Sequence, residues 1–291
     1  MRLADRMLRL DRRWIFLLVA AAVTVPLFLK WRQPITITPE ARGVYDAVER
    51  LAAGSRVLLS CDYDPGTQAE LQPMAVTFLR QCFSRRLRVI IMGLWPQGPQ
   101  QADLALAEAL KDPRIAALHP RYGIDYVNLG FQSGNEVVIQ RMGSDIPAVF
   151  PQDARGEPIS RLPIMDGVKD FSSIAYIFEL TGGYPGSVEW VQFAGDRFHA
   201  RIGCGSTAVG APQIYPYFPH QLTGVLGGMK GAAEYEELTG FPGKGTVYML
   251  SQSFAHVIVI LFIVLGNLAF FYMRRRKPAG PQDGPPEGET A

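Results

Sequence analysis

Two aspartates stand one residue apart where a strongly apolar run ends. The run RVLLSC at 56–61 has the composition of a buried strand, and Asp62 and Asp64 follow it directly. Two carboxylates in such a place can coordinate a hard divalent cation or act as acid and base. Asp64 precedes Pro65 and would also serve as the N-cap of a helix, while a turn carboxylate bonded to local amides is the commoner role for Asp62. Both are candidate catalytic residues.

Cys204, in the glycine-rich stretch GCGSTAVGAP at 203–212, is the third candidate catalytic residue. A catalytic thiol needs a neighbouring base, and His199 stands five residues upstream. The glycines would let the backbone approach an anion that the hydroxyls of Ser206 and Thr207 could hold, so these two are candidate ligand-binding residues. An ordinary glycine-rich turn is the commoner explanation of such a stretch.

The three cysteines are too few for a disulfide scaffold, and their spacing matches no zinc motif, so no metal site is expected. Cys61 and Cys204 both follow strand-like runs. We therefore expect their side chains to lie close together and to be able to form a disulfide outside the cytoplasm.

Strand-like runs alternate with helical periodicity through the middle of the chain. The pattern predicts an α/β fold with a three-layer, mainly parallel, Rossmann-like sheet of about five strands. The first helix has Thr38 as its cap and Pro39 in its first turn, and the second opens at Asp64. The expected strands cover residues 56–61, 87–94, 124–131, 172–180 and 197–204, and further helices lie near 101–111, 135–142 and 188–192.

Ligands of such sheets bind beyond the carboxyl ends of the strands. The loops that follow the third and fourth expected strands therefore add Ser133, Asn135 and Tyr184 to the candidate ligand-binding residues. The stretch 143–170 is rich in proline and has few periodic apolar positions. It is expected to be an excursion from the core, either a lid or a disordered segment.

The stretch 215–240 is unusual because aromatic residues and prolines precede several glycines. Either these glycines lie in a helix and admit a second backbone, or a loop leads to a short helix at Ala232–Leu238. Lys230 and Glu234 are four residues apart and would pair on a helix surface, so we include them as candidate ligand-binding residues.

Two apolar runs bracket this domain. Phe254–Met273 is long enough to cross a bilayer and carries no formal charge. Trp14–Leu29 is shorter and contains Pro26; it is also compatible with a cleaved signal sequence, but Lys30 and the residues after it form a poor cleavage site. The expected organisation is a basic tail at 1–13, a transmembrane helix at 14–30, an α/β domain at 31–252, a second transmembrane helix at 253–273 and a disordered tail at 274–291.

Arginines are concentrated in the two tails. This distribution predicts cytoplasmic termini and an extracytoplasmic domain in a plasma membrane of bacterial type. Residues 14–273 carry 20 basic and 22 acidic side chains, so no cationic face for nucleic acid is expected.

Two functional classes stay open, and the sequence names neither a substrate nor a cofactor. The first, which we favour, is a non-catalytic, membrane-anchored module that binds a partner protein or ligand and helps to assemble a membrane complex. Its partners would be the lipid bilayer and either another membrane protein or further copies of the chain. The alternative is an anchored hydrolase or transferase that uses Asp62, Asp64 and the 203–207 loop. Whether the chain is an enzyme is left undecided.

Overall fold

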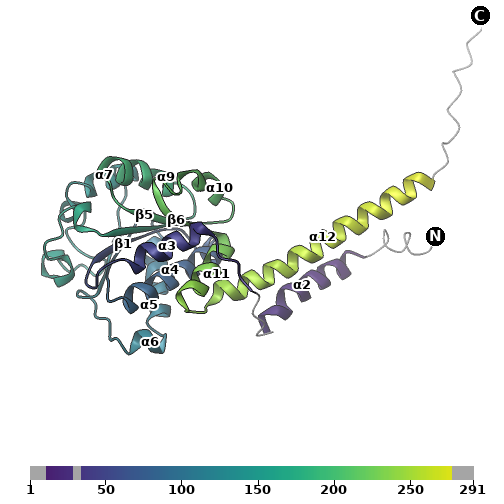
Figure 1. Cartoon of the computed structure of the whole chain (residues 1–291), viewed down its shortest axis with the longest axis horizontal. Coiled ribbons are helices and arrows are strands. Elements are labelled where there is room, and N and C mark those ends of the chain that lie inside the picture. The colour runs from purple at the N-terminus through teal and green to yellow at the C-terminus, as the bar shows by residue number, and fades with distance from the viewer. Residues whose placement is uncertain (1–10, 29–33, 277–291) are drawn as a thin grey trace, which may run out of the picture. The chain divides into compact units, whose positions relative to one another are not determined.

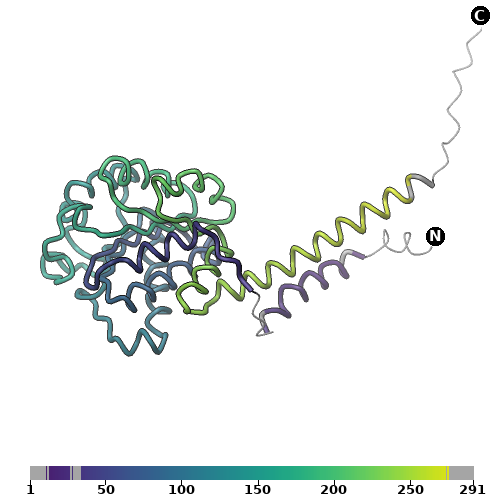
Figure 2. Tube along the Cα trace, in the orientation of Figure 1, coloured from purple at the N-terminus to yellow at the C-terminus, as the bar shows by residue number. Residues whose placement is uncertain are grey.

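The structure is a computed structural model that describes residues 11–28 and 34–276 (Figure 2). The expected tails at 1–10 and 277–291, and residues 29–33 at the end of the first apolar run, lie outside the described residues. The chain divides into two units, Arg32–Met249 and the pair of segments Met1–Trp31 and Leu250–Ala291. Each unit is described by itself.

The unit Arg32–Met249 is built on a parallel sheet of six strands in the order β3-β2-β1-β4-β5-β6 (Figure 1). This is the strand order of a Rossmann-type sheet, and it reverses between β1 and β4. The predicted fold class is therefore confirmed for the α/β domain. The strands are β1 (Arg56–Asp62), β2 (Arg88–Gly93), β3 (Tyr126–Phe131), β4 (Tyr176–Thr181), β5 (Ile202–Ser206) and β6 (Leu222–Gly227).

The sequence predicted one strand too few, because β6 lies in the glycine-rich stretch that we expected to be helix or loop. Its glycines meet the backbone of another element. A Cβ on Gly224 would stand 2.3 Å from the Val44 nitrogen and 2.5 Å from the Glu40 carbonyl oxygen. The first helix of the domain thus packs directly on this edge strand, and a side chain at position 224 would prevent the contact.

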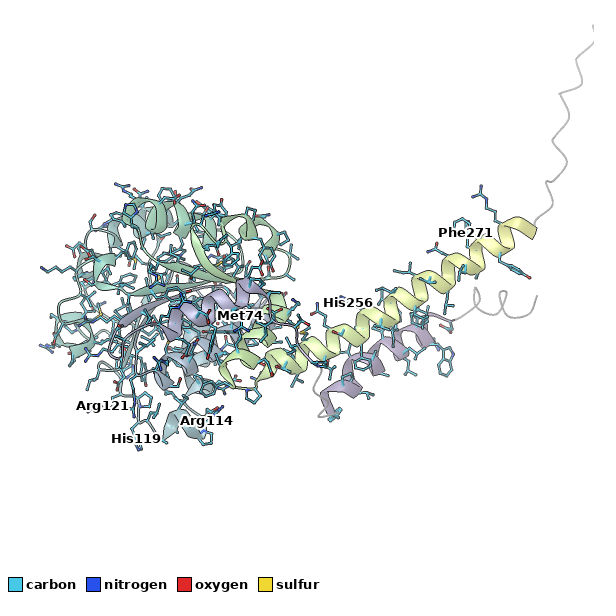
Figure 3. The ribbon with its side chains drawn as sticks, in the orientation of Figure 1. Met74, Arg114, His119, Arg121, His256 and Phe271 are labelled. Carbon is cyan, nitrogen blue, oxygen red and sulfur yellow. The ribbon has the colours of Figure 1, made fainter. Side chains whose placement is uncertain are left out.

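One face of the sheet is covered by four long helices (Figure 1). Successive strand residues point to opposite faces, so the odd-numbered residues of β1 and the even-numbered residues of β4 pack in this layer. Met74 in the second of these helices is fully buried within it (Figure 3). The helices are α3 (Pro39–Glu49), α4 (Gln68–Ser84), α5 (Gly98–Ala109) and α11 (Gly228–Thr239), with the short α6 (Pro113–Ala116) beside them.

The opposite face is covered by shorter elements, including the stretch 143–170 that we expected to be an excursion. That expectation was wrong, because eight apolar side chains between Ile146 and Val168 are buried in the second hydrophobic cluster. Their spacing follows short turns rather than one helical period, which hid them from a periodicity search. The elements of this layer are α7 (Glu136–Met142), α8 (Ile146–Val149), α9 (Ser187–Trp190), α10 (Ala211–Ile214), the π-helix Val191–Asp196, and the 3-10 turns Ile159–Arg161, Pro163–Met165, Phe171–Ser173 and Tyr215–Tyr217.

The first predicted helix start is confirmed and the second is wrong. The Thr38 hydroxyl accepts a hydrogen bond from the Ala41 nitrogen, and Pro39 opens α3. Asp64 instead accepts hydrogen bonds from the Gly66 and Thr67 nitrogens, at 2.9 and 3.2 Å, and closes a turn before α4 begins at Gln68. Asp64 is therefore a turn residue and not the N-cap of that helix.

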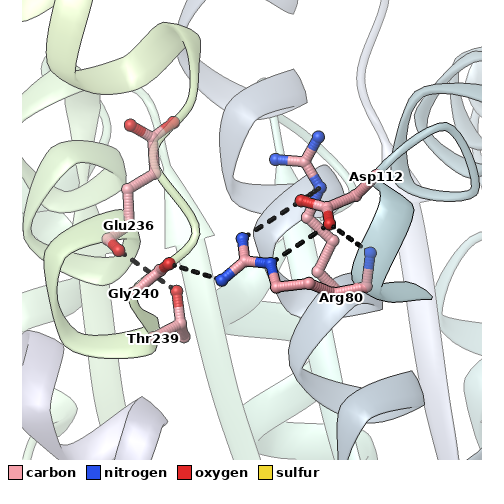
Figure 4. A network of polar contacts seen from close by, with 6 residues as sticks. Arg80, Asp112, Glu236, Thr239 and Gly240 are labelled. Carbon is pink, nitrogen blue, oxygen red and sulfur yellow. Dashed lines mark hydrogen bonds and ion pairs between the residues drawn. The ribbon is translucent and has the colours of Figure 1, made fainter.

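The C-terminal end of α11 is fixed by a polar network (Figure 4). The Asp112 carboxylate lies 3.1 Å from the Arg114 guanidinium and 3.8 Å from that of Arg80. Arg114 also donates to the carbonyl oxygen of Gly240, the residue that follows α11, at 2.9 Å. The hydrogen bond from Arg114 lowers the pKa of Asp112, so the carboxylate stays ionised at neutral pH.

The second unit contains α2 (Arg12–Phe28), and most of α12 (Lys244–Arg276) belongs to it. Among the described residues, one helix is long and apolar enough to cross a membrane, at Lys244–Tyr272, and only 6% of its most apolar window is buried. His256 and Phe271 mark positions along it in Figure 3. The apolar part of α2, Arg13–Pro26, is shorter, so of the two expected membrane spans only the second is found as a candidate among the described residues. The structure thus gives weak support to membrane association through α12.

Candidate functional site

A row of polar side chains crosses the middle of the sheet near the carboxyl ends of its strands. Ser60 in β1 is paired with Glu179 in β4, and Glu179 is paired with Cys204 in β5. Asp62 lies two residues beyond Ser60 and points to the same face. All four residues are buried, and we call them the buried polar row.

Every hydrogen-bonding contact of the Asp62 carboxylate is made inside the protein. One oxygen accepts the Leu94 nitrogen at 2.5 Å, and the other accepts the Ser60 hydroxyl at 2.6 Å and the Trp190 indole nitrogen at 3.3 Å. Burial raises the pKa of Asp62 to about 6, although these hydrogen bonds act in the opposite direction. The arrangement ties together the ends of β1 and β2 and the first turn of α9.

Glu179 is the least satisfied member of the buried polar row. One of its oxygens accepts the Ser187 hydroxyl, and the other has no hydrogen-bond partner among the described residues. Burial and the neighbouring Asp62 carboxylate both raise its pKa well above the usual value. Because two adjacent buried carboxyls cannot both ionise cheaply, we expect this pair to hold at least one proton near neutral pH.

The environment of Cys204 does not favour a nucleophilic thiolate. Burial raises its pKa, with Glu179 adding to the effect, so the thiol stays protonated at neutral pH. His199, the base considered from the sequence, is exposed.

The predicted disulfide between Cys61 and Cys204 is wrong, since both thiols are free. Strand β4 lies between β1 and β5, and the two side chains belong to hydrophobic clusters on opposite faces of the sheet. Reasoning from strand ends could not reveal this separation, because it depends on strand order and on residue parity.

The loop residues after β3 and β4 come together at the surface, apart from the buried polar row. Tyr184 is exposed, and its hydroxyl donates to the Glu136 carboxylate at 3.0 Å. Asn135 precedes α7 in a left-handed backbone conformation, and Ser133 is exposed. The structure thus brings Tyr184 next to the start of α7, and it does not place Ser133 or Tyr184 beside Asp62.

Ser206 and Thr207 serve the turn after β5. Ser206 is buried at the end of the strand, and the Thr207 hydroxyl accepts the Gly210 nitrogen at 3.2 Å. The short α10 follows at Ala211. These contacts fit the glycine-rich turn that the sequence offered as the commoner explanation.

Lys230 and Glu234 line a cavity of about 200 Å³ beside β6, between the start of α3 and the first turns of α11. We call it the edge pocket. The Lys230 ammonium lies 2.5 Å from one Glu234 oxygen, and the other oxygen accepts the Thr38 nitrogen and hydroxyl at 3.2 and 2.5 Å. The predicted pairing on a helix surface is confirmed, although Glu234 is only 1% exposed.

The sequence search missed Glu179, Ser187 and Trp190. Glu179 carried one usable signal, since it is the only charged residue in the strand-like run SSIAYIFEL. A charge within a strand that is buried on both faces is rare unless the side chain is paired. Nothing comparable distinguished Ser187 or Trp190.

Within the described parts of the chain, no three histidine, cysteine or carboxylate side chains are grouped in a way that would hold a metal ion. Comparisons of the chain with models of protein families, with curated proteins and with solved structures found no match. The function must therefore be argued from the molecule itself.

Proposed function

We propose that this chain is a membrane-anchored α/β module that binds a partner protein or ligand and helps to assemble a membrane complex, without catalysing a reaction. In this proposal both apolar helices, α2 and α12, are anchors, the termini are cytoplasmic and the α/β domain is extracytoplasmic. The length and composition of α12 support an anchor at that end, and the arginine-rich tails support the orientation.

The observation that carries the proposal is the contrast between buried and exposed groups at the carboxyl edge of the sheet. Asp62, the strongest catalytic candidate, is completely buried, and both of its carboxylate oxygens accept hydrogen bonds from inside the protein. The same edge exposes apolar side chains instead, at the end of β3, in α7 and in the loops after β4 and β5. These are Phe131 (40% exposed), Val137 (55%), Tyr184 (62%) and Val209 (88%). Where exposed apolar groups form a contiguous patch, they are typical of surfaces that bind other proteins.

The enzyme alternative retains one observation in its favour. Glu179 has an unpartnered oxygen beside Asp62, and strongly raised carboxyl pKa values are characteristic of catalytic sites. A hydrolase or transferase would need substrate to reach this pair. The edge pocket and two further cavities, at 129–154 and 195–223, are lined by other residues.

The test measures the mass of the particle formed by the full chain after mild detergent extraction from its membrane. We expect a particle larger than one 32.2 kDa chain with its detergent. Val209→Asp together with Tyr184→Asp should reduce the particle to a single chain, because both changes place a charge on the apolar edge. The Asp62→Asn variant should retain the large particle.

A single aspartate placed away from this edge, Leu104→Asp on α5, is the control for each of the two edge substitutions made singly, since Leu104 is 47% exposed. A single chain in every extract, or an edge variant that assembles like the control, would contradict the proposal.

A further inference from the structure

The edge pocket combines an unpaired carboxylate with a lysine whose ammonium group has unused hydrogen-bond donors. Glu40 lines the pocket from the first turn of α3, and no described side chain forms a hydrogen bond or ion pair with its carboxylate. Lys230, whose side chain is 55% exposed, uses one ammonium hydrogen on Glu234. An ammonium group has three donors, so two remain available to a ligand.

Tyr215 closes the pocket with a hydroxyl that also lacks a partner among the described residues. Its oxygen lies against Gly227, where a Cβ would come within 2.3 Å of it. Burial raises the pKa of Tyr215, and the Glu40 carboxylate raises it further, which means that the two groups interact electrostatically. The glycine therefore leaves room for the phenol at the wall of the pocket that Glu40 also lines.

The charges in the pocket determine which ligand it would accept. Glu234 is neutralised by Lys230 and held by Thr38, so Glu40 is the carboxylate left to attract a cation. The free hydrogens of Lys230 attract an anionic oxygen. The volume of about 200 Å³ admits about seven non-hydrogen atoms, if each is taken to need the roughly 30 Å³ of a water molecule.

We propose that the edge pocket binds a small zwitterion, with its primary ammonium on Glu40 and Tyr215 and its acidic group on Lys230. Small α-amino acids and phosphoethanolamine, whether free or as a lipid headgroup, share this chemistry. The inference rests on the proposed function, since it specifies a ligand for a binding module.

Calorimetric titration of the full chain in detergent with glycine, alanine and phosphoethanolamine tests the inference. At least one of them should bind, and phosphocholine should bind at least tenfold more weakly than phosphoethanolamine, because a quaternary ammonium has no hydrogen to donate. Glycine or alanine as the tighter ligand identifies an amino-acid site. Phosphoethanolamine as the tighter ligand identifies a site for this headgroup. Binding to lipid nanodiscs with and without phosphatidylethanolamine then shows whether the ligand is the lipid or free phosphoethanolamine.

Glu40→Gln and Lys230→Met should each weaken binding about tenfold, the loss of one charge-assisted hydrogen bond. The matched controls are Glu237→Gln and Lys111→Met, which remove exposed charges outside the pocket. Thermal unfolding confirms that each variant is folded.

The inference is overturned if no zwitterion binds at 50 mM, if phosphocholine binds as well as phosphoethanolamine, or if folded Glu40→Gln and Lys230→Met bind like their controls. The particle mass measured above does not depend on this ligand. A large particle without zwitterion binding would remove the inference and leave the proposed function standing.

Discussion

At the scale of single residues, the central feature is a pair of carboxyls sealed inside a parallel sheet. Asp62 is bound by three donors from three segments, while Glu179 has one donor and one free oxygen. Buried carboxyls are costly when ionised, and removing one hydrogen-bonding partner leaves the others unsatisfied. We therefore expect the pair to make the stability of the domain depend on pH.

The expected direction follows from the proton balance. An unfolded Asp62 releases its proton near pH 3.8, and the folded carboxyl holds it until about pH 6. Between these values the folded state binds more protons, so the free energy of unfolding falls as the pH rises. At about 1.4 kcal/mol for each pKa unit, the shift of Asp62 corresponds to a total loss of about 3 kcal/mol, of which about 2 kcal/mol falls between pH 4 and 6. Because the pKa of Glu179 is also raised, Glu179 continues this loss in the free energy of unfolding to higher pH.

Denaturant unfolding of the full chain in detergent, followed by tryptophan fluorescence from pH 4 to 8, measures this dependence. In the double variant Asp62→Asn with Glu179→Gln, the free energy of unfolding should no longer fall with rising pH through these two carboxyls. Asp166→Asn, an exposed control, should keep the wild-type profile. A double variant with an unchanged profile would show that the two carboxyls do not titrate in this way.

At the scale of elements, α11 connects the two places where the chain enters and leaves the domain. Glu234 binds Thr38, which caps α3 at the entry. Glu236 accepts the Gly245 and Thr246 nitrogens, both at 2.8 Å, in the first turn of α12 at the exit. The two glutamates are each 1% exposed. A carboxylate at a helix N-terminus satisfies unpaired N–H groups and interacts favourably with the helix dipole.

Glu236→Gln should loosen the start of α12. The amide keeps one acceptor but turns an NH₂ group toward donors, so we expect a loss of about 1 to 2 kcal/mol in the local opening free energy. Hydrogen exchange of the amides at 244–247 measures it, and these amides should exchange about five- to thirtyfold faster than in wild type. Glu237→Gln, which removes an exposed charge one residue away, should leave the exchange unchanged. Equal exchange in the two variants would mean that Glu236 does not cap the helix.

At the scale of the whole molecule, an α/β domain and a long apolar helix occupy one chain. The α12 helix begins inside the unit Arg32–Met249 and continues to Arg276. Most of its described apolar side chains from Val257 onward are exposed, although Ala269 is buried, and such exposure is typical of a helix surrounded by lipid. The function that we propose requires the domain and the tails to lie on opposite sides of the membrane.

Thiol labelling tests this topology directly, because the three native cysteines are buried. A cysteine introduced by Lys111→Cys should react with a membrane-impermeant maleimide in intact cells. One introduced in the tail by Glu289→Cys should react only after the cells are permeabilised. The reverse pattern would place the domain in the cytoplasm and overturn the proposed orientation.

The sequence by itself determined the α/β class, five of the six strands, the cap of α3, the Lys230–Glu234 pair and the apolar helix near the C-terminus. Each of these depends on contacts between residues close in the chain, or on the burial of a strand on both faces, and both leave a periodic pattern. Only the tertiary structure decided which groups meet. Strand order separated Cys61 from Cys204, and residue parity brought Glu179 beside Asp62. The glycine-rich stretch forms an edge strand on which α3 packs closely at Gly224. The physical reason is that these outcomes depend on contacts between segments distant in sequence, and no local pattern records them.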